Sequence, residues 1–283
     1  MNGLPEARRK LEAIGAQERA DPRIDPRSVT AWWLGEEPAP LVIVLLHGLS
    51  NGPLQYAELA PQLAARGHAV LVPRMPFHGY RDRLTTALAA MRASDLEGTA
   101  LRTLAIAALC GRRVAVAGIS LGATLAGWLA ARVAVDHAVA VAPFCGARGI
   151  PEHVSEALGS MLRAAPNRFA WWDPRRGAAQ PPPHAYPRFA TRALGESLLV
   201  STTLEAPGAS AHARRATLVL NASEPAVSNV CALRRFAALA RAGVALEDVV
   251  WEGLPPIHDL IEPRIPQART DLVYPRLIEL LES

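Results

Sequence analysis

Lysine is nearly missing from this chain, because Lys10 is the only one and arginine carries almost all of the positive charge. The 283 residues have a formal net charge of +4. Basic residues occur singly or in pairs such as Arg112-Arg113, and they form no dense strip interleaved with aromatic side chains. We therefore expect no nucleic-acid-binding surface.

Cysteine is also scarce, since the chain has only Cys110, Cys145 and Cys231. Their odd number and their spacing match neither a disulfide framework nor a metal site. We expect buried free thiols, which are typical of a reducing compartment. The sequence predicts no metal and no organic cofactor.

Long apolar runs are missing too. The run Leu41–Leu46 is far shorter than the roughly 20 residues that span a bilayer. The segment Met1–Arg19 is charged and lacks the apolar centre of a secretory signal. We expect a cytoplasmic protein without stable membrane insertion. Half of the residues are hydrophobic, which is enough for a buried core.

Short apolar runs alternate with segments of helical periodicity along most of the chain. This alternation predicts an α/β fold with a mostly parallel central sheet and helices on both faces. The expected strands are 28–34, 41–47, 68–73, 113–119, 137–142, 216–221 and 246–253. The expected helices are 5–19, 54–66, 94–110, 120–133, 226–242 and 268–282.

The alternation lapses over residues 145–214, which are rich in proline, arginine and alanine. The run Gln180–Pro183 is incompatible with a helix or a central strand, and helical pieces are expected only near 152–165 and 187–199. A loop of about 70 residues is too long for a compact domain, so we interpret the segment as an inserted cap. The predicted organisation is an N-terminal helix and early strand in 1–40, a core in 41–144 and 215–283, and a cap in 145–214.

The segment Gly118-Ile119-Ser120-Leu121-Gly122 follows an apolar strand and begins a helix. A sharp turn from strand to helix needs small flanking residues, because the residue at its tip has a strained backbone. The helix N-terminus also favours developing negative charge. This context predicts that Ser120 is a nucleophile; the alternative is a glycine-serine turn without chemistry.

Two further residues follow later strands of the predicted sheet. His258 lies in the loop after the last strand, where open α/β sheets build their sites, and it can act as the base that a serine requires. Glu224 follows the strand 216–221 and can orient that histidine. For the acid, Asp259, Glu252 and Glu262 are alternatives.

The segment His47-Gly48-Leu49 follows the strand 41–47. Hydrolysis by a serine needs two backbone donors for the oxyanion, and the N–H groups of Leu49 and Leu121 are the candidates. We expect His47 to brace its loop by hydrogen bonds. The remaining histidines are interpreted as structural: His68, His78, His137, His153, His184 and His212.

These segments resemble the α/β-hydrolase family, in its bacterial carboxylesterase and monoacylglycerol-lipase-like branch. The resemblance covers about 41–143 and 216–282. The stretch Val72–Gly79 is similar to a turn of that family, with Phe77 where a glycine is common. The family most often has aspartate where this chain has Glu224. The resemblance implies an α/β-hydrolase fold, the nucleophile Ser120, the base His258, the acid Glu224 and the oxyanion donors Leu49 and Leu121.

The predicted function is hydrolysis of a small-molecule carboxylic ester through an acyl-enzyme. The same triad also serves acyltransferases, amidases and C–C hydrolases, and a non-catalytic binding protein is a further alternative. Epoxide and haloalkane hydrolases are disfavoured because they have an aspartate in place of Ser120. A homodimer through helix 5–19 stays open. Bulky apolar side chains of the predicted cap either line an acyl pocket or attach the cap to the core: Met161, Phe169, Trp171, Trp172, Tyr186 and Phe189.

Overall fold

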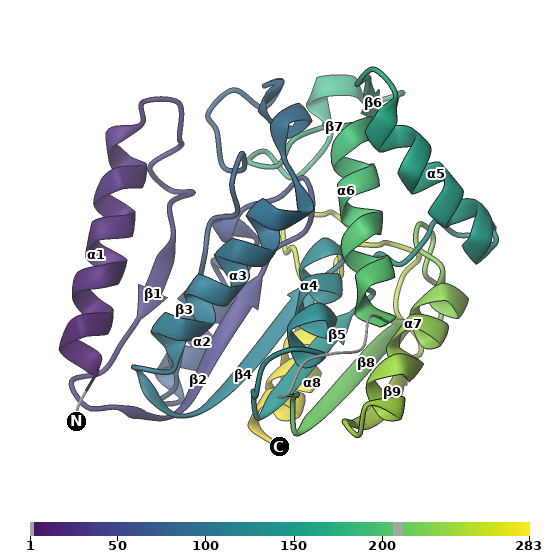
Figure 1. The fold of residues 1–283 in the computed structure, drawn as a ribbon. Coiled ribbons are helices and arrows are strands. Elements are labelled where there is room, and N and C mark those ends of the chain that lie inside the picture. The colour runs from purple at the N-terminus through teal and green to yellow at the C-terminus, as the bar shows by residue number, and fades with distance from the viewer. Residues whose placement is uncertain (1–2, 206–211) are drawn as a thin grey trace.

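The computed structural model describes residues 3–205 and 212–283, so residues 1–2 of the predicted N-terminal region and 206–211 of the predicted cap lie outside the described residues. Within these ranges, seven strands form the central sheet: β1 (Ala31–Trp33), β2 (Ala39–Leu46), β3 (Ala69–Val72), β4 (Gly111–Ile119), β5 (His137–Val141), β8 (Arg215–Asn221) and β9 (Ala245–Trp251). Their order is β1-β3-β2-β4-β5-β8-β9 (Figure 1). Only β1 runs antiparallel to its neighbour, which confirms the predicted α/β fold with a mostly parallel sheet.

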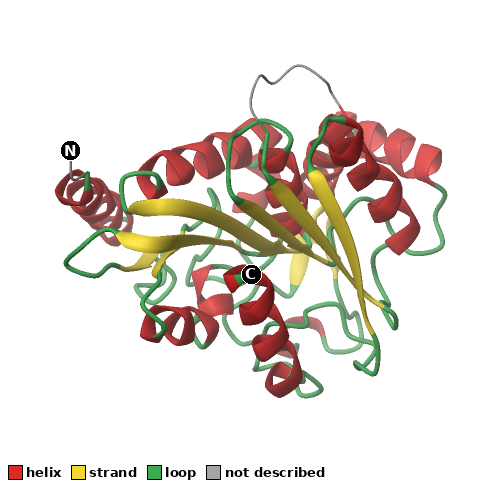
Figure 2. Cartoon of the chain, turned by 90° about the horizontal axis from the view of Figure 1, so that it is seen from below, coloured by secondary structure: helices red, strands yellow, loops and turns green. Residues whose placement is uncertain are grey.

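Helices cover both faces of the sheet (Figure 2). Strand β2 shows how the two cores form, because successive side chains of a strand point to opposite faces. Val42, Val44 and Leu46 pack into one core, whereas Ile43 and Leu45 pack into the other. The strand is therefore buried on both faces and apolar throughout. The first core is covered by α1 (Leu4–Ala20), α3 (Ala93–Ala107), α4 (Leu121–Ala130) and α7 (Asn229–Arg241), and the second by α2 (Leu59–Ala65) and α8 (Thr270–Glu282).

Helix α1 docks on the body of the protein. Leu4, Ala7 and Leu11 are buried in the first core, so the apolar face of this helix is covered within one chain. The predicted helix 54–66 is wrong in its first half, where a 3-10 turn, η1 (Pro53–Tyr56), precedes α2. Pro61 explains the break, since its ring would clash with the carbonyl of residue 57 in a continuous helix.

Residues 145–214, which we call the insertion, lie between β5 and β8. Their regular elements are α5 (Glu152–Ala164), β6 (Phe169–Trp171), β7 (Arg188–Ala190) and α6 (Thr191–Thr202), with short 3-10 turns at Gly177–Ala179 and Thr203–Glu205. Strands β6 and β7 pair antiparallel, so the predicted helix 187–199 begins only at Thr191. Figure 1 shows α5 and α6 side by side, and α6 also packs against α4.

Candidate active site

Ser120 lies at the sharp turn between β4 and α4. Its backbone has φ +56° and ψ −118°, an unfavourable region for a residue with a side chain. Gly118 and Gly122 must be glycines because other backbone atoms come too close to them for a side chain to fit. A Cβ atom at Gly118 would lie 2.2 Å from the carbonyl carbon of Gly122, and one at Gly122 would lie 1.9 Å from the carbonyl oxygen of Leu46. The turn therefore packs directly against the end of β2 and leaves room for no larger residue at either glycine.

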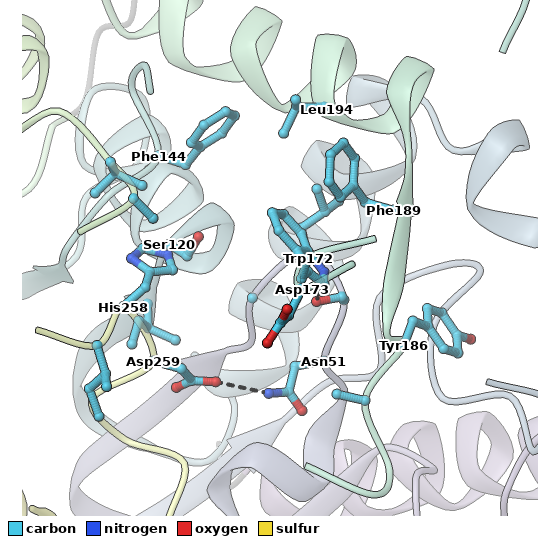
Figure 3. A pocket seen from close by; sticks show the side chains of 18 of the residues that line it. Asn51, Ser120, Phe144, Trp172, Asp173, Tyr186, Phe189, Leu194, His258 and Asp259 are labelled. Carbon is cyan, nitrogen blue, oxygen red and sulfur yellow. Dashed lines mark hydrogen bonds between the residues drawn. The ribbon is translucent and has the colours of Figure 1, made fainter. Parts of the chain in front are cut away.

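His258 and Glu224 come together at the same edge of the sheet. The distance between His258 Nδ1 and Glu224 Oε1 is 3.0 Å. The Glu224 side chain is 1% exposed and the His258 side chain 25% exposed. Both Ser120 and His258 line one cavity, and Figure 3 shows them at the same wall of it. Because Glu224 occupies Nδ1, the His258 Nε2 is the ring nitrogen left to face a substrate.

The extra methylene of a glutamate is accommodated within its own turn. Glu224 Oε1 also accepts hydrogen bonds from the Ala226 N–H at 2.8 Å and the Val227 N–H at 3.2 Å. The Arg148 guanidinium donates to the Glu224 carbonyl oxygen at 2.8 Å, which ties the turn to the start of the insertion. The side chain thus curls back onto the turn, and its carboxylate still reaches His258.

The pairing changes the pKa of both groups. Burial disfavours the charged form of Glu224, but the hydrogen bond and charge of His258 outweigh it and lower the carboxyl pKa. Burial likewise disfavours the imidazolium of His258, but the hydrogen bond and charge of Glu224, with the charge of Asp259, raise its pKa above 6.5. His258 is therefore more basic than an isolated imidazole.

The alternative acids lie elsewhere. Asp259 Oδ2 accepts hydrogen bonds from Gln55 Nε2 at 2.7 Å and Asn51 Nδ2 at 3.1 Å. Glu262 is fully buried; its Oε1 forms an ion pair with Arg264 at 2.9 Å, and its Oε2 lies 3.2 Å from His184 Nε2. Glu252 is exposed. Of the four candidates, Glu224 is the one that holds the His258 ring by a hydrogen bond.

The loop after β2 is held from several sides. His47 is fully buried, its Nδ1–H donates to the Gly48 carbonyl oxygen at 3.0 Å, and its Nε2 accepts the Met75 N–H at 3.1 Å. His78 Nε2 lies 2.6 Å from the Leu49 carbonyl oxygen. Burial lowers the pKa of both histidines, that of His78 to about 4, so both stay neutral at pH 7. This confirms that His47 braces the loop.

The backbone N–H groups of Leu49 and Leu121, the two expected oxyanion donors, have different surroundings. Within the described residues, the Leu49 N–H donates to no protein group, and Leu49 lines the cavity. Leu121 is the first residue of α4, and amides of a first helical turn have no acceptor inside the helix. Gly48 lies beside Ser120, since a Cβ atom there would be in van der Waals contact with the Ser120 Cβ at 3.8 Å.

A polar network beside this loop was not predicted from the sequence. Gln55 Oε1 accepts the Gly48 N–H at 2.9 Å, while its Nε2 donates to Asp259. Asn51 Oδ1 accepts a hydrogen bond from His184 Nε2 of the insertion at 2.8 Å. Burial and the charge of Glu262 raise the pKa of Asp259 to about 6. The network joins the loop after β2, the loop of His258 and the insertion.

The cavity has a volume of about 680 Å³ and two kinds of wall. One is apolar and includes Phe144, Leu194 and Phe189; the other carries the polar side chains Asn51 and Asp259 (Figure 3). Four of the six bulky apolar residues of the insertion take one or both of the roles considered for them. Trp172, Tyr186 and Phe189 line the cavity, Phe169 packs against the first core, and Met161 and Trp171 are exposed.

Predictions from the sequence also concern the cysteines, possible metal-binding groups and possible membrane-spanning helices. All three cysteines are buried and free, as predicted. In the ranges 3–205 and 212–283, no three His, Cys, Asp or Glu side chains are grouped so that they could hold a metal ion. No helix in those same ranges is both long enough and apolar enough to cross a membrane.

The fold and this site define a class of protein. The model of the alpha/beta hydrolase family matches residues 43–274, and the chain belongs to that family. No curated protein sequence matches the chain.

Solved structures of other proteins have the same fold. A structure described for LipS and LipT, two metagenome-derived lipolytic enzymes, has a TM-score of 0.63 at 17% identity over 92% of this chain and 99% of its own. The monoacylglycerol lipase of Paleococcus ferrophilus has a TM-score of 0.62 at 18% identity, over 89% and 97%. A soluble variant of the monoglyceride lipase of Saccharomyces cerevisiae has a TM-score of 0.65 at 11% identity, over 89% and 90%. At these identities the likeness shows the fold.

Proposed function

We propose that this chain is a serine-dependent carboxylic ester hydrolase that works through an acyl-enzyme intermediate. The observation that carries the proposal is a strained serine at the wall of a cavity that His258 also lines, with His258 joined to the buried Glu224 carboxylate by a 3.0 Å hydrogen bond. A serine hydroxyl becomes a nucleophile when a base accepts its proton, and the carboxylate orients and stabilises that base.

The reaction has two halves. In the first, Ser120 Oγ attacks the acyl carbon while His258 Nε2 takes its proton, and the Leu49 and Leu121 N–H groups bind the oxyanion. His258 then gives the proton to the leaving alcohol, so that the acyl group stays on Ser120. In the second half, His258 takes a proton from water, which attacks the acyl carbon, and returns that proton to Ser120 as the acid leaves. Each oxyanion donor of this kind lowers the barrier by about 3–4 kcal/mol.

The walls of the cavity favour a small-molecule ester with an apolar acyl group. Phe144, Leu194 and Phe189 offer an apolar surface beside the nucleophile, as acyl-binding pockets require. The lipolytic enzymes and monoacylglycerol lipases among the similar structures act within the same fold, and their names agree with an ester substrate.

The test is hydrolysis of p-nitrophenyl esters from acetate to palmitate by the wild type and by Ser120→Ala. We expect turnover by the wild type and a loss of about 10⁵–10⁶-fold in the variant, because nucleophile and base act as a unit. Ser160→Ala, at an exposed position of α5, is the matched control and should keep full activity. Circular dichroism checks the fold of both variants.

Equal turnover by Ser120→Ala would refute the proposal. If the wild type hydrolyses no ester, hydrolysis of aryl amides and transfer to added alcohols or amines distinguish the amidase and acyltransferase alternatives. A chain that performs none of these reactions is a binding protein on a hydrolase fold.

A further inference from the structure

The side chain of Gln55 connects the proposed oxyanion loop to the residue after the proposed base. Its Oε1 accepts the Gly48 N–H at 2.9 Å, and its Nε2 donates to Asp259 Oδ2 at 2.7 Å. Gln55 is buried, with 1% of its surface exposed. The hydrogen bond to Gly48 therefore lies in the interior, whereas the one to Asp259 lies at the wall of the cavity, which Gln55 and Asp259 both line.

Asp259 determines which way the Gln55 amide points. An ionised carboxylate only accepts hydrogen bonds, so the NH₂ end of Gln55 must face Asp259 and the oxygen must face Gly48. Asn51 Nδ2 donates to the same Oδ2 at 3.1 Å, which holds the carboxylate in place. If a hydrogen-bond donor replaced Asp259 Oδ2, the Gln55 amide would favour the opposite orientation. Its NH₂ group would then face the Gly48 N–H, and the hydrogen bond to Gly48 would be lost.

The orientation of Gln55 matters because it fixes one side of the peptide that carries the oxyanion donor. The Gly48 carbonyl oxygen accepts from the Asn51 N–H at 3.1 Å and from His47 Nδ1 at 3.0 Å. In a planar trans peptide, the Leu49 N–H points opposite to that carbonyl. Gln55 holds the preceding N–H of Gly48, so both rotations about the Gly48 Cα are constrained.

We propose that Gln55 and Asp259 are positioning residues that hold the Leu49 N–H in place as an oxyanion donor. The proposal rests on the function proposed above. It also gives a reason for the place of Asp259 in the chain: one loop carries the base His258 and the carboxylate that orients the oxyanion loop. Base and oxyanion donor are thereby placed relative to each other by a single loop.

The test compares Gln55→Glu with the double variant Gln55→Glu/Asp259→Asn. In the single variant two carboxylates face each other at the position of the 2.7 Å hydrogen bond between Gln55 and Asp259, and the introduced side chain must move away from Gly48. Complete loss of one oxyanion donor reduces kcat by about 10²–10³-fold, so we expect a loss of about tenfold or more with KM changed less than about threefold. In the double variant the introduced asparagine amide can donate to the introduced glutamate, and kcat should recover at least in part.

The measurement is kcat for a p-nitrophenyl ester per active site, counted from the burst of p-nitrophenol, so that misfolded protein does not contribute. Gln62→Glu is the matched control, since it makes the same change at an exposed position of α2 and should leave kcat unchanged. If Gln55→Glu does not fold, Gln55→Met removes both hydrogen bonds without adding charge and should lower kcat in the same way.

Three results would overturn the inference, provided that the wild type hydrolyses esters. The first is a wild-type kcat per site in Gln55→Glu or Gln55→Met, and the second is a change in KM alone. The third is a double variant whose kcat is no higher than that of Gln55→Glu. A wild type without any Ser120-dependent turnover would overturn the proposed function, and the inference with it.

Discussion

Glu224 stands where this family most often has an aspartate, and its geometry shows how the longer side chain reaches the His258 ring. Oε1 is shared by three donors, the His258 ring and the amides of Ala226 and Val227. The backbone amides of its own turn therefore hold the carboxylate in place, and the carboxylate in turn holds the His258 ring. Such a site should depend on the charge of Glu224 as well as on its position.

The pH dependence of kcat/KM tests this pairing. His258 must be neutral to accept a proton, and its pKa is raised, so we expect kcat/KM to rise with pH through a midpoint above 6.5. Glu224→Gln removes the charge that raises this pKa, while burial, which lowers it, remains. The midpoint should move down, and kcat should fall by about 10³–10⁴-fold because the wrong tautomer is favoured.

The same pairing makes the free energy of unfolding depend on pH. His258 stabilises the fold at low pH, and Glu224 stabilises it at high pH. The raised pKa of His258 adds stability below pH 6.5, which is lost as the pH rises through the folded-state value. The lowered pKa of Glu224 adds stability above pH 4.5, which is lost as the pH falls through its folded-state value. Glu252→Gln, at an exposed site, is the control for both profiles. If Glu224→Gln left the midpoint of the kcat/KM profile unchanged, that result would contradict the pairing of Glu224 with His258.

At the level of single residues, the candidate nucleophile, base and acid were predictable because each follows a strand of recognisable pattern. Ser120 is identified by a local motif, and His258 and Glu224 by their position after β9 and β8. Gln55 and Asp259 were not predicted as partners, because their contact joins positions 204 residues apart. No local periodicity carries a signal for such a pair.

At the level of elements, one arginine of the body makes four hydrogen bonds to the proline-rich loop of the insertion. The Arg83 guanidinium donates to four carbonyl oxygens of this loop, at distances of 2.7–3.1 Å; they belong to Ala178, Gln180, Pro182 and Ala185. The residue that follows this loop contacts the loop after β2, where the Tyr186 N–H donates to the Ser50 carbonyl oxygen at 2.8 Å. Arg83 therefore supports one wall of the cavity.

Replacing Arg83 should loosen that wall. Hydrogen bonds to charged groups contribute about 1.5–3 kcal/mol each when buried, and exposure reduces this, so we expect Arg83→Met to lower the free energy of unfolding by about 1–3 kcal/mol. KM for long-chain esters should rise, while Ser120 stays reactive. Arg175→Met, at an exposed position of the same insertion, is the control. Thermal unfolding and ester kinetics measure the two effects; an unchanged KM and unfolding temperature would refute this role.

Elements were predictable where their pattern is local. The strands and helices of the core follow from apolar runs and helical spacing, and the outcome matches them closely from β2 to α8. The pair β6–β7 was not predicted, because Phe169 and Ala190 meet across a long separation and neither strand has an alternating pattern of its own. Pro61 was the sign within the sequence that the helix 54–66 would be divided.

At the level of the whole molecule, the order of strands brings the parts of the site together. Strands β2, β4, β5, β8 and β9 lie side by side and run parallel, so the loops after them meet at one edge of the sheet (Figure 1). The loop after β2 carries Leu49, the turn after β4 carries Ser120, and the loops after β8 and β9 carry Glu224 and His258. Residues of the insertion after β5 line the cavity at this edge.

The most direct test of this account is to identify the residue that a serine-directed p-nitrophenyl phosphonate modifies. We expect one adduct per chain by intact mass, located by peptide mapping to the peptide that contains Ser120, absent from Ser120→Ala and formed much more slowly in His258→Ala. Such a result would establish an activated serine at the turn after β4. An adduct on another residue, or labelling that persists at the wild-type rate in either variant, would contradict the account.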